Sequence, residues 1–273
     1  KSRGLGDRHW EALALQVFGL SKALQGTMSA YEEALGHLAS ARNLCRELQL
    51  WSCHWSIELN MARLYLESQQ PRKAMQVAEE ALVLIQDLGD VHSEYLAYGL
   101  LCQAILDVDT DVSQAEGRAR EAVDRFKSKG PRPHALALNL LSGVLSETKL
   151  GHARKVIQEA LSISKHLGDV DLEAQMWLRL SSIEAVSERD DETLQALEKA
   201  MELWKQLPET SEAIACARYL SISVLLRMFD PKDSLKEASQ VRAFFAEEKD
   251  AHREALTLVA ISSVSFARND HVD

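Results

Sequence analysis

The stretch Leu88-Gly89-Asp90 decides the fold, because the same tripeptide returns at residues 167–169 and also occurs at residues 5–7. Lys129-Gly130-Pro131 and Leu207-Pro208-Glu209 fall between these copies at matching intervals. Equivalent positions about four residues past these turns, and past two further turns at Gln49 and Lys249, recur at spacings of 43, 40, 40, 39, 40 and 41; they are Glu11, His54, Glu94, His134, Glu173, Ala213 and Glu254. A fixed period of about forty residues is typical of a repeat protein.

Every repeat carries a large apolar residue followed by a small one at the same distance past the turn. The large residues are Phe18, Met61, Leu101, Leu141, Leu180, Leu220 and Ile261, and the small ones are Gly19, Ala62, Cys102, Ser142, Ser181, Ser221 and Ser262. A small side chain lets a neighbouring helix approach closely. We therefore expect one helix of each repeat to pack tightly against another at this pair.

A second helix is predicted about twelve residues further on. Its small and apolar residues follow a spacing of four and then three, which places them on one face of a helix. In chain order these residues are Ala34, Leu38 and Ala41; Ala74, Ala78 and Ala81; Ala115, Ala119 and Ala122; Ala153, Ile157 and Ala160; Thr193, Leu197 and Ala200; and Ser234, Ala238 and Val241. The small residues on this face predict that the backbones of two helices pack closely in each repeat.

The turns between repeats also follow from local chemistry. Glycine is expected at the end of a helix, where a left-handed residue carries no side-chain penalty, and three such positions hold it: Gly89, Gly130 and Gly168. Asp90 and Asp169 follow two of these glycines and should cap the next helix. Gln49 and Lys249 stand where two further glycines would be expected.

This pattern resembles the tetratricopeptide repeat family, which stacks pairs of helices, A and B, into a superhelix. The forty-residue period and the Leu-Gly-Asp turn are similar to the variety found in kinesin light chains and in the G-protein-signalling scaffolds that orient mitotic spindles. The resemblance implies an all-α fold, a right-handed α-solenoid of six antiparallel helix pairs and one extra helix. Tyr65 alone matches the family's aromatic residue toward the end of helix A, and one repeat carries the charged Glu184 at this position.

We expect residues 1–273 to form a single array of such repeats. The expected boundaries are 7–49, 50–89, 90–130, 131–168, 169–208 and 209–249, with a half repeat at 250–273. Repeat arrays need polar caps at their ends. Leu5-Gly6-Asp7 is interpreted as the exit turn of a preceding repeat, and we therefore expect a piece of a longer protein, the rest of which could contact this segment.

Composition and charge exclude several classes of protein. The 12 glycines and 5 prolines among 273 residues are too few for the turns of an all-β protein. The formal charge of −10, from 31 basic and 41 acidic residues, argues against nucleic acid as a partner. No apolar run is long enough for a membrane span. The four cysteines, Cys45, Cys53, Cys102 and Cys216, have no metal-site spacing and predict free thiols in a cytoplasmic protein.

No catalytic signature occurs in the sequence. The motifs H-E-x-x-H, G-x-G-x-x-G, G-x-x-x-x-G-K-[ST] and G-x-S-x-G are all missing. We therefore expect a protein that is not an enzyme and that carries neither a metal nor a cofactor.

The resemblance places the A helices on the concave surface, where the family binds its ligands. Carried over position by position, it implies a peptide-binding set of Asn60, Arg63, Gln103, Asn139, Gln175, Arg179 and Arg218. Arginine suits carboxylates, and asparagine can hold a peptide backbone through its donor and its acceptor. The alternative is that these arginines pair with nearby acids such as Glu67, Asp107 and Glu147.

The resemblance thus favours a non-catalytic protein-protein interaction scaffold that binds a peptide or protein segment, with acidic groups, in the concave groove. The alternative is a ligand-sensing regulatory module of a larger signalling protein, which would bind a small molecule or a short peptide.

Overall fold

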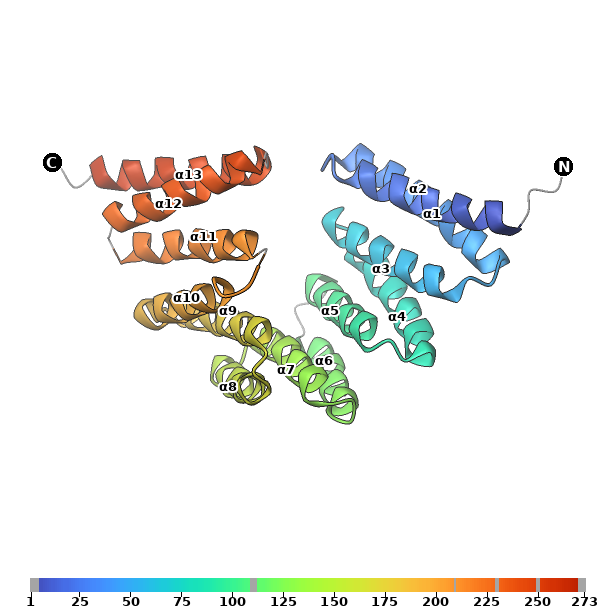
Figure 1. Cartoon of the computed structure of the whole chain (residues 1–273), viewed down its shortest axis with the longest axis horizontal. Coiled ribbons are helices and arrows are strands. Elements are labelled where there is room, and N and C mark those ends of the chain that lie inside the picture. The colour runs from blue at the N-terminus through green and yellow to red at the C-terminus, as the bar shows by residue number, and fades with distance from the viewer. Residues whose placement is uncertain (1–4, 109–111, 209, 229–230, 249–250, 270–273) are drawn as a thin grey trace. The chain divides into compact units, whose positions relative to one another are not determined.

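The computed structural model describes residues 5–108, 112–208, 210–228, 231–248 and 251–269. These residues form thirteen α-helices and no β-strand (Figure 1). The helices are α1 (Leu5–Ala23), α2 (Met28–Glu47), α3 (Trp51–Glu67), α4 (Pro71–Leu88), α5 (Val91–Val108), α6 (Val112–Lys127), α7 (Pro131–Leu145), α8 (Leu150–Leu167), α9 (Val170–Val186), α10 (Asp190–Trp204), α11 (Ser211–Arg227), α12 (Pro231–Glu247) and α13 (Ala251–Asn269). This is the predicted all-α solenoid of six helix pairs and one extra helix. Odd-numbered helices are the A helices and even-numbered helices are the B helices.

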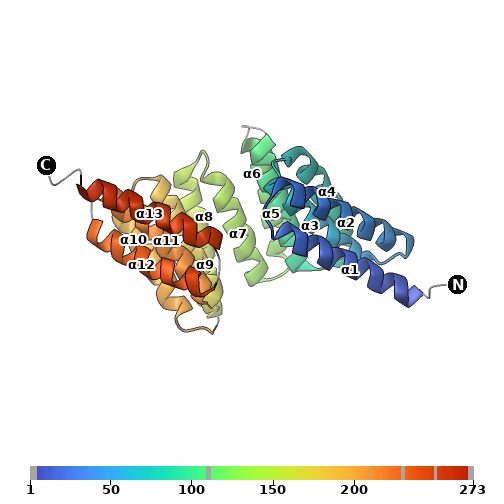
Figure 2. The ribbon, with the colours of Figure 1, turned by 90° about the horizontal axis from the view of Figure 1, so that it is seen from above.

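The chain forms two compact units, Lys1–Pro133 and His134–Asp273. We call them the N-terminal and the C-terminal unit. Four of the B helices, α2, α4, α10 and α12, each pack against the A helix before them and against the A helix after them. Figures 1 and 2 show α1 beside α2 and α12 beside α13 in both views. None of the described helices is long and apolar enough to cross a membrane.

The predicted face of the B helices forms the centre of the repeats. All eighteen residues at the four-then-three positions are buried, with at most 2% of any of them exposed. The majority are alanines, so each B helix can lie close to its two neighbours without large side chains between the backbones. The prediction of a tightly packed second helix is confirmed.

The small residue of each A helix marks another close approach. A Cβ atom on Gly19 would lie only 3.0 Å from the carbonyl oxygen of Ala34 on the paired helix. The equivalent small residues of the next five A helices are also buried; they are Ala62, Cys102, Ser142, Ser181 and Ser221. Ser262 on α13 is exposed, because the described part of the chain holds no B helix that pairs with α13.

The expected turn residues adopt the expected conformation. Gly89, Gly130 and Gly168 have positive φ angles of 73°, 120° and 65°. Gln49 takes φ 55° in the equivalent turn without the freedom of a glycine. Lys249, the other exception, lies outside the described residues.

Both aspartates cap the helices that follow them. The Asp90 carboxylate accepts hydrogen bonds from the backbone N–H groups of His92 at 3.1 Å and Ser93 at 3.3 Å. Asp169 accepts one from the N–H of Leu172 at 3.0 Å. These bonds satisfy N–H groups that the first turn of a helix leaves without partners.

The expectation for Leu5-Gly6-Asp7 is wrong. These residues belong to helix α1, which begins at Leu5, and so do not form a turn. Gly89 and Gly168 each end a preceding helix. The first turn of a helix also tolerates a glycine and favours an aspartate through the helix dipole, so the same tripeptide is compatible with a helix start.

Candidate functional site

The seven predicted binding residues all lie on A helices. Asn60 and Arg63 are on α3 and Gln103 is on α5, in the N-terminal unit; Asn139 is on α7, Gln175 and Arg179 are on α9, and Arg218 is on α11, in the C-terminal unit. The four residues of the C-terminal unit are buried or half-buried.

Asn139 and Arg179 are brought together across two neighbouring repeats. The Nε atom of Arg179 donates a hydrogen bond to the Oδ1 atom of Asn139 at 3.1 Å, and the two residues are 40 positions apart. Gly143 lies one helical turn after Asn139, and a Cβ atom on it would stand 3.3 Å from Cζ of Arg179. Because Gly143 has no side chain, the Arg179 guanidinium can pack directly against α7. This contact orients the guanidinium before any ligand arrives.

The other two residues of the C-terminal unit bind to acids of their own repeats. Arg218 Nη1 lies 2.7 Å from Glu237 Oε2 on α12, a different acid from those that the sequence suggested. Gln175 Nε2 donates to Asp171 Oδ2 at 2.8 Å, while the second oxygen of Asp171 accepts from Trp204 Nε1 at 3.1 Å.

In the N-terminal unit the predicted residues bind to groups one turn away on the same helix. Asn60 Nδ2 donates to the carbonyl oxygen of Ser56 at 2.9 Å, and Gln103 Nε2 donates to Asp107 Oδ1 at 2.8 Å. Arg63 Nε lies 3.8 Å from Glu67 Oε1, and both side chains are exposed. Exposed pairs of this kind contribute only about 0.3–0.5 kcal/mol, so a ligand can displace them at little cost.

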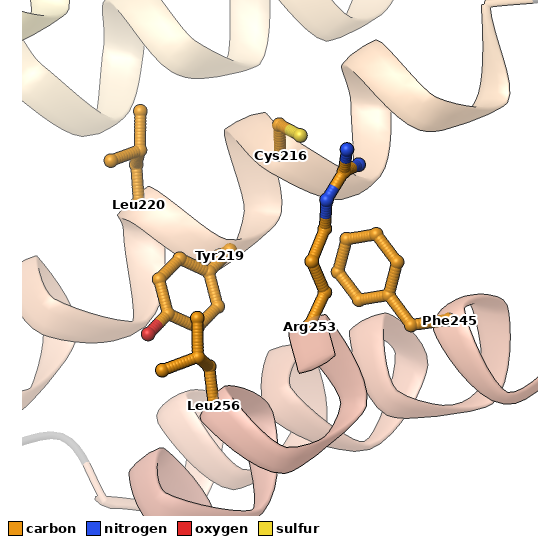
Figure 3. A pocket seen from close by; sticks show the side chains of 6 residues that line it. All are labelled: Cys216, Tyr219, Leu220, Phe245, Arg253 and Leu256. Atoms are coloured by element: carbon orange, nitrogen blue, oxygen red, sulfur yellow. The ribbon is translucent and has the colours of Figure 1, made fainter. Parts of the chain in front are cut away.

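A pocket that the sequence did not predict lies among the last three helices. Figure 3 shows its lining: Cys216, Tyr219 and Leu220 from α11, Phe245 from α12, and Arg253 and Leu256 from α13. Its volume is about 400 Å³. The Arg253 guanidinium lies 5.4 Å from the centre of the Phe245 ring and forms an ion pair with Glu212. The wall is thus mainly apolar, with one charged group at its edge.

The pocket is open because one edge of α11 is left uncovered. Leu220 is 43% exposed, whereas the equivalent residues of α3, α5, α7 and α9 are at most 9% exposed; these are Met61, Leu101, Leu141 and Leu180. The same holds for Cys216, which is exposed while Ile57, Ala97, Ala137 and Met176 are fully buried. The residue at position 220 is an ordinary member of the repeat pattern. The sequence therefore carried no signal that could have revealed the pocket.

The comparisons with known proteins concern the fold. No protein-family model and no curated protein sequence matches the chain. Among solved structures, it is similar to a signal-transduction ATPase with a tetratricopeptide repeat sensor from Pyrococcus horikoshii, with a TM-score of 0.59 and 15% identity over 94% of this chain and 39% of that one. It is also similar to aspartyl phosphate phosphatase F from Bacillus subtilis, with a TM-score of 0.60 and 14% identity over 93% of this chain and 70% of that one.

A third similar structure is a Rap protein in complex with competence and sporulation factor. Its TM-score is 0.57, with 12% identity over 93% of this chain and 75% of that one. The chain spans about two fifths of the length of the Pyrococcus ATPase. At these identities the likeness concerns architecture alone: the chain shares a helical-repeat fold with these structures.

Proposed function

We propose that this chain is a non-catalytic protein-interaction scaffold that binds a peptide or protein segment on its A helices. The observation that carries the proposal is the uncovered edge of α11. There the exposed Leu220 and Leu256 line an apolar pocket, and Leu220 stands at a position that α3, α5, α7 and α9 bury against a neighbour. A partner that covers these side chains would be bound more tightly, because burial of one exposed leucine contributes about 1.5–3 kcal/mol of favourable free energy.

A partner would be anchored in this pocket by an apolar side chain. Pockets with mainly apolar walls and a few polar groups are the usual form of binding sites, and the pocket's volume of about 400 Å³ lies within their usual range. Arg253 at the edge favours an acidic group beside the apolar anchor, although its ion pair with Glu212 must then be exchanged.

Asn139 and Arg179 would contact the partner's backbone and its carboxylates. An arginine presents a planar set of donors that matches a carboxylate, and the hydrogen bond that Arg179 donates to Asn139 holds that plane in place. Preorientation of this kind lowers the entropy lost on binding. These residues and the pocket all belong to the C-terminal unit.

The solved structures support this proposal by likeness of fold. One of them is described as an ATPase with a tetratricopeptide repeat sensor, and another was solved in complex with competence and sporulation factor. A fold alone does not fix a function, and the evidence for binding therefore comes from the pocket and the Asn139–Arg179 pair. We further propose that the repeats belong to the forty-residue variety typified by kinesin light chains, because of their period and their glycine turns.

The test begins with peptides selected from a random library displayed on phage, with the whole chain immobilised. Each selected peptide is labelled with fluorescein, and its Kd is measured by fluorescence anisotropy. Leu220→Asp should raise Kd at least about tenfold, because it removes an apolar contact and places a charge in the pocket. Val83→Asp is the matched control, since Val83 is also an exposed apolar residue but lies on α4, away from the pocket lining.

Two results would contradict the proposal. In the first, the selected peptides bind Leu220→Asp and Arg179→Ala as tightly as the unchanged chain. In the second, Val83→Asp weakens binding as much as Leu220→Asp does. Circular dichroism on each variant separates a loss of binding from a loss of fold.

A second candidate function is a ligand-sensing module. The size of the pocket favours this possibility, because it would also hold a small apolar molecule. Such a ligand should raise the melting temperature of the chain when no second protein is present.

A further inference from the structure

The turn between α2 and α3 brings two cysteines together. Cys45 lies in the last turn of α2 and Cys53 in the first turn of α3. Both are joined to Leu50: its N–H group donates to the carbonyl oxygen of Cys45 at 2.9 Å, and its carbonyl oxygen accepts from the N–H group of Cys53 at 3.2 Å. The left-handed Gln49 reverses the chain at this point.

Their side chains also meet. Cys45 is completely buried, and Cys53 is half-buried. Burial raises the pKa of Cys45 to about 11, and the neighbouring Cys53 adds to the rise through its negative charge when it is ionised and through a hydrogen bond between the two side chains. Cys45 is therefore a poor nucleophile toward a reagent in solution, whereas Cys53 is within reach of one.

We propose that Cys45 and Cys53 form a redox site, at which a hydroperoxide converts the two thiols into a disulfide between α2 and α3. The Cys53 sulfur attacks one peroxide oxygen, the O–O bond breaks, and Cys53 becomes a sulfenic acid while water leaves. The Cys45 sulfur then attacks the sulfur of Cys53, the S–O bond breaks, and a second water carries away the thiol proton. Two thiols and one hydrogen peroxide thus give one disulfide and two waters.

The other two cysteines are placed differently. The thiol of Cys102 is buried in the core and donates to the carbonyl oxygen of Ala115 at 3.6 Å. Cys216 is exposed and lies in the pocket of the C-terminal unit. Cys102 should therefore resist oxidation, and Cys216 is the residue most able to form bonds between molecules.

The disulfide would fix the junction between two repeats. It would close a loop of nine residues that contains Gln49, a non-glycine residue with a positive φ of 55°. The exposed Trp51 lies within this loop, and the buried His54 follows it directly. Oxidation should therefore restrict movement of α3 against α2 and raise the melting temperature of the N-terminal unit.

The experiment uses the whole chain with Cys216→Ser, which prevents cross-links between molecules through that residue. The protein is treated with one equivalent of hydrogen peroxide, its remaining thiols are blocked with N-ethylmaleimide in urea, and it is digested with trypsin. Cleavage after Arg42, Arg46 and Arg63 separates the two cysteines. The expected product is peptide 43–46 joined to peptide 47–63, with Cys102 carrying N-ethylmaleimide.

A glutathione redox buffer supplies the quantitative control. Cysteines so close in sequence can also pair in an unfolded chain, so the equilibrium constant of the disulfide is measured in native buffer and in concentrated urea. We expect the native value to be at least about tenfold higher, with a matching rise in melting temperature on oxidation. Cys102→Ser should leave both results unchanged, and Cys53→Ser should abolish them.

Two outcomes would overturn the proposal. One is an equilibrium constant in native buffer that is equal to or lower than that in urea, which would show that the fold does not favour the bond. The other is accumulation of Cys53 sulfinic acid without the joined peptides, which would show that Cys45 cannot reach it. Both outcomes are independent of whether the chain binds peptides.

Discussion

Replacement of Arg154 by methionine should unfold the C-terminal unit more easily, because it leaves a buried carboxylate without its main partner. Glu184 on α9 is only 5% exposed, and it occupies the A-helix position where most other repeats place an aromatic or aliphatic residue. Arg154 on α8 binds both of its oxygens, with Nε 2.6 Å from Oε1 and Nη2 2.5 Å from Oε2. The repeat pattern does not explain a charge at this position, whereas this bidentate pair does.

The size of the effect follows from the burial of the two groups. Removal of one partner of a fully buried ion pair costs about 3–5 kcal/mol. Here Arg154 remains a quarter exposed and Arg189 Nη1 stays 3.8 Å from Glu184, so we expect about 2–3 kcal/mol. For a unit of this size the loss lowers the melting temperature by about 5–10 °C.

The assay is a double-mutant cycle followed by urea denaturation and circular dichroism at pH 7. Arg154→Met combined with Glu184→Leu should be within about 1 kcal/mol of the unchanged chain, because an apolar pair replaces the ionic one. The coupling between the two positions should be about 2 kcal/mol. A loss below about 0.5 kcal/mol for Arg154→Met alone, or additive effects, would refute the reasoning.

Four further outcomes are expected. Ala160→Leu should lower the free energy of unfolding by about 1–3 kcal/mol in urea denaturation, because Ala160 is fully buried between helices; unchanged stability would show that the packing face is misplaced. Gly168→Val should destabilise by about 1–2 kcal/mol in the same assay, since φ is 65° there, and an equal loss in Gly151→Val, at a helical glycine with open space, would contradict that cause. Burial, and then Arg46 and Arg42, lowers the pKa of His54 below its ordinary value of 6.5, so stability should fall as the pH drops from 6.5 through the lowered pKa, and His54→Asn should remove this dependence in melts at several pH values. Arg179→Ala should weaken binding of the selected peptides at least about tenfold in anisotropy titrations while the helical circular dichroism is kept; a loss of helix would show that the residue is structural.

Glu58 adds to the pH dependence of the same region with the opposite sign. It is completely buried on α3, where burial raises its pKa despite the nearby Arg42 and Arg46. A carboxyl whose pKa is raised in the folded state stabilises that state at low pH, and the contribution is lost as the pH rises through the raised value. The part of the pH dependence of stability that is due to His54 is therefore best measured in a chain with Glu58→Gln.

The helix pairs and their turns could be predicted because they depend on local chemistry. Alanines such as Ala160 recur with the period of one helical face, and a residue at that spacing is buried whatever the neighbouring repeat contains. Gly89 and Gly168 end their helices for a reason that lies within a few residues. Leu5-Gly6-Asp7 shows the limit of such reasoning, because one tripeptide can begin a helix or end one according to what precedes it.

The sequence by itself determined the repeat, the buried face of each B helix and the list of polar residues on the A helices. Only the tertiary structure decided which of those residues meet, as Arg179 meets Asn139 over Gly143, and which apolar residues stay open, as Leu220 does while Leu180 is covered. The physical reason is that burial within a repeat follows from helical periodicity, which is a property of the chain. Contact between repeats depends on the distance between whole helices. That distance is set by the packing of many side chains at once, and these side chains come from positions far apart in the sequence.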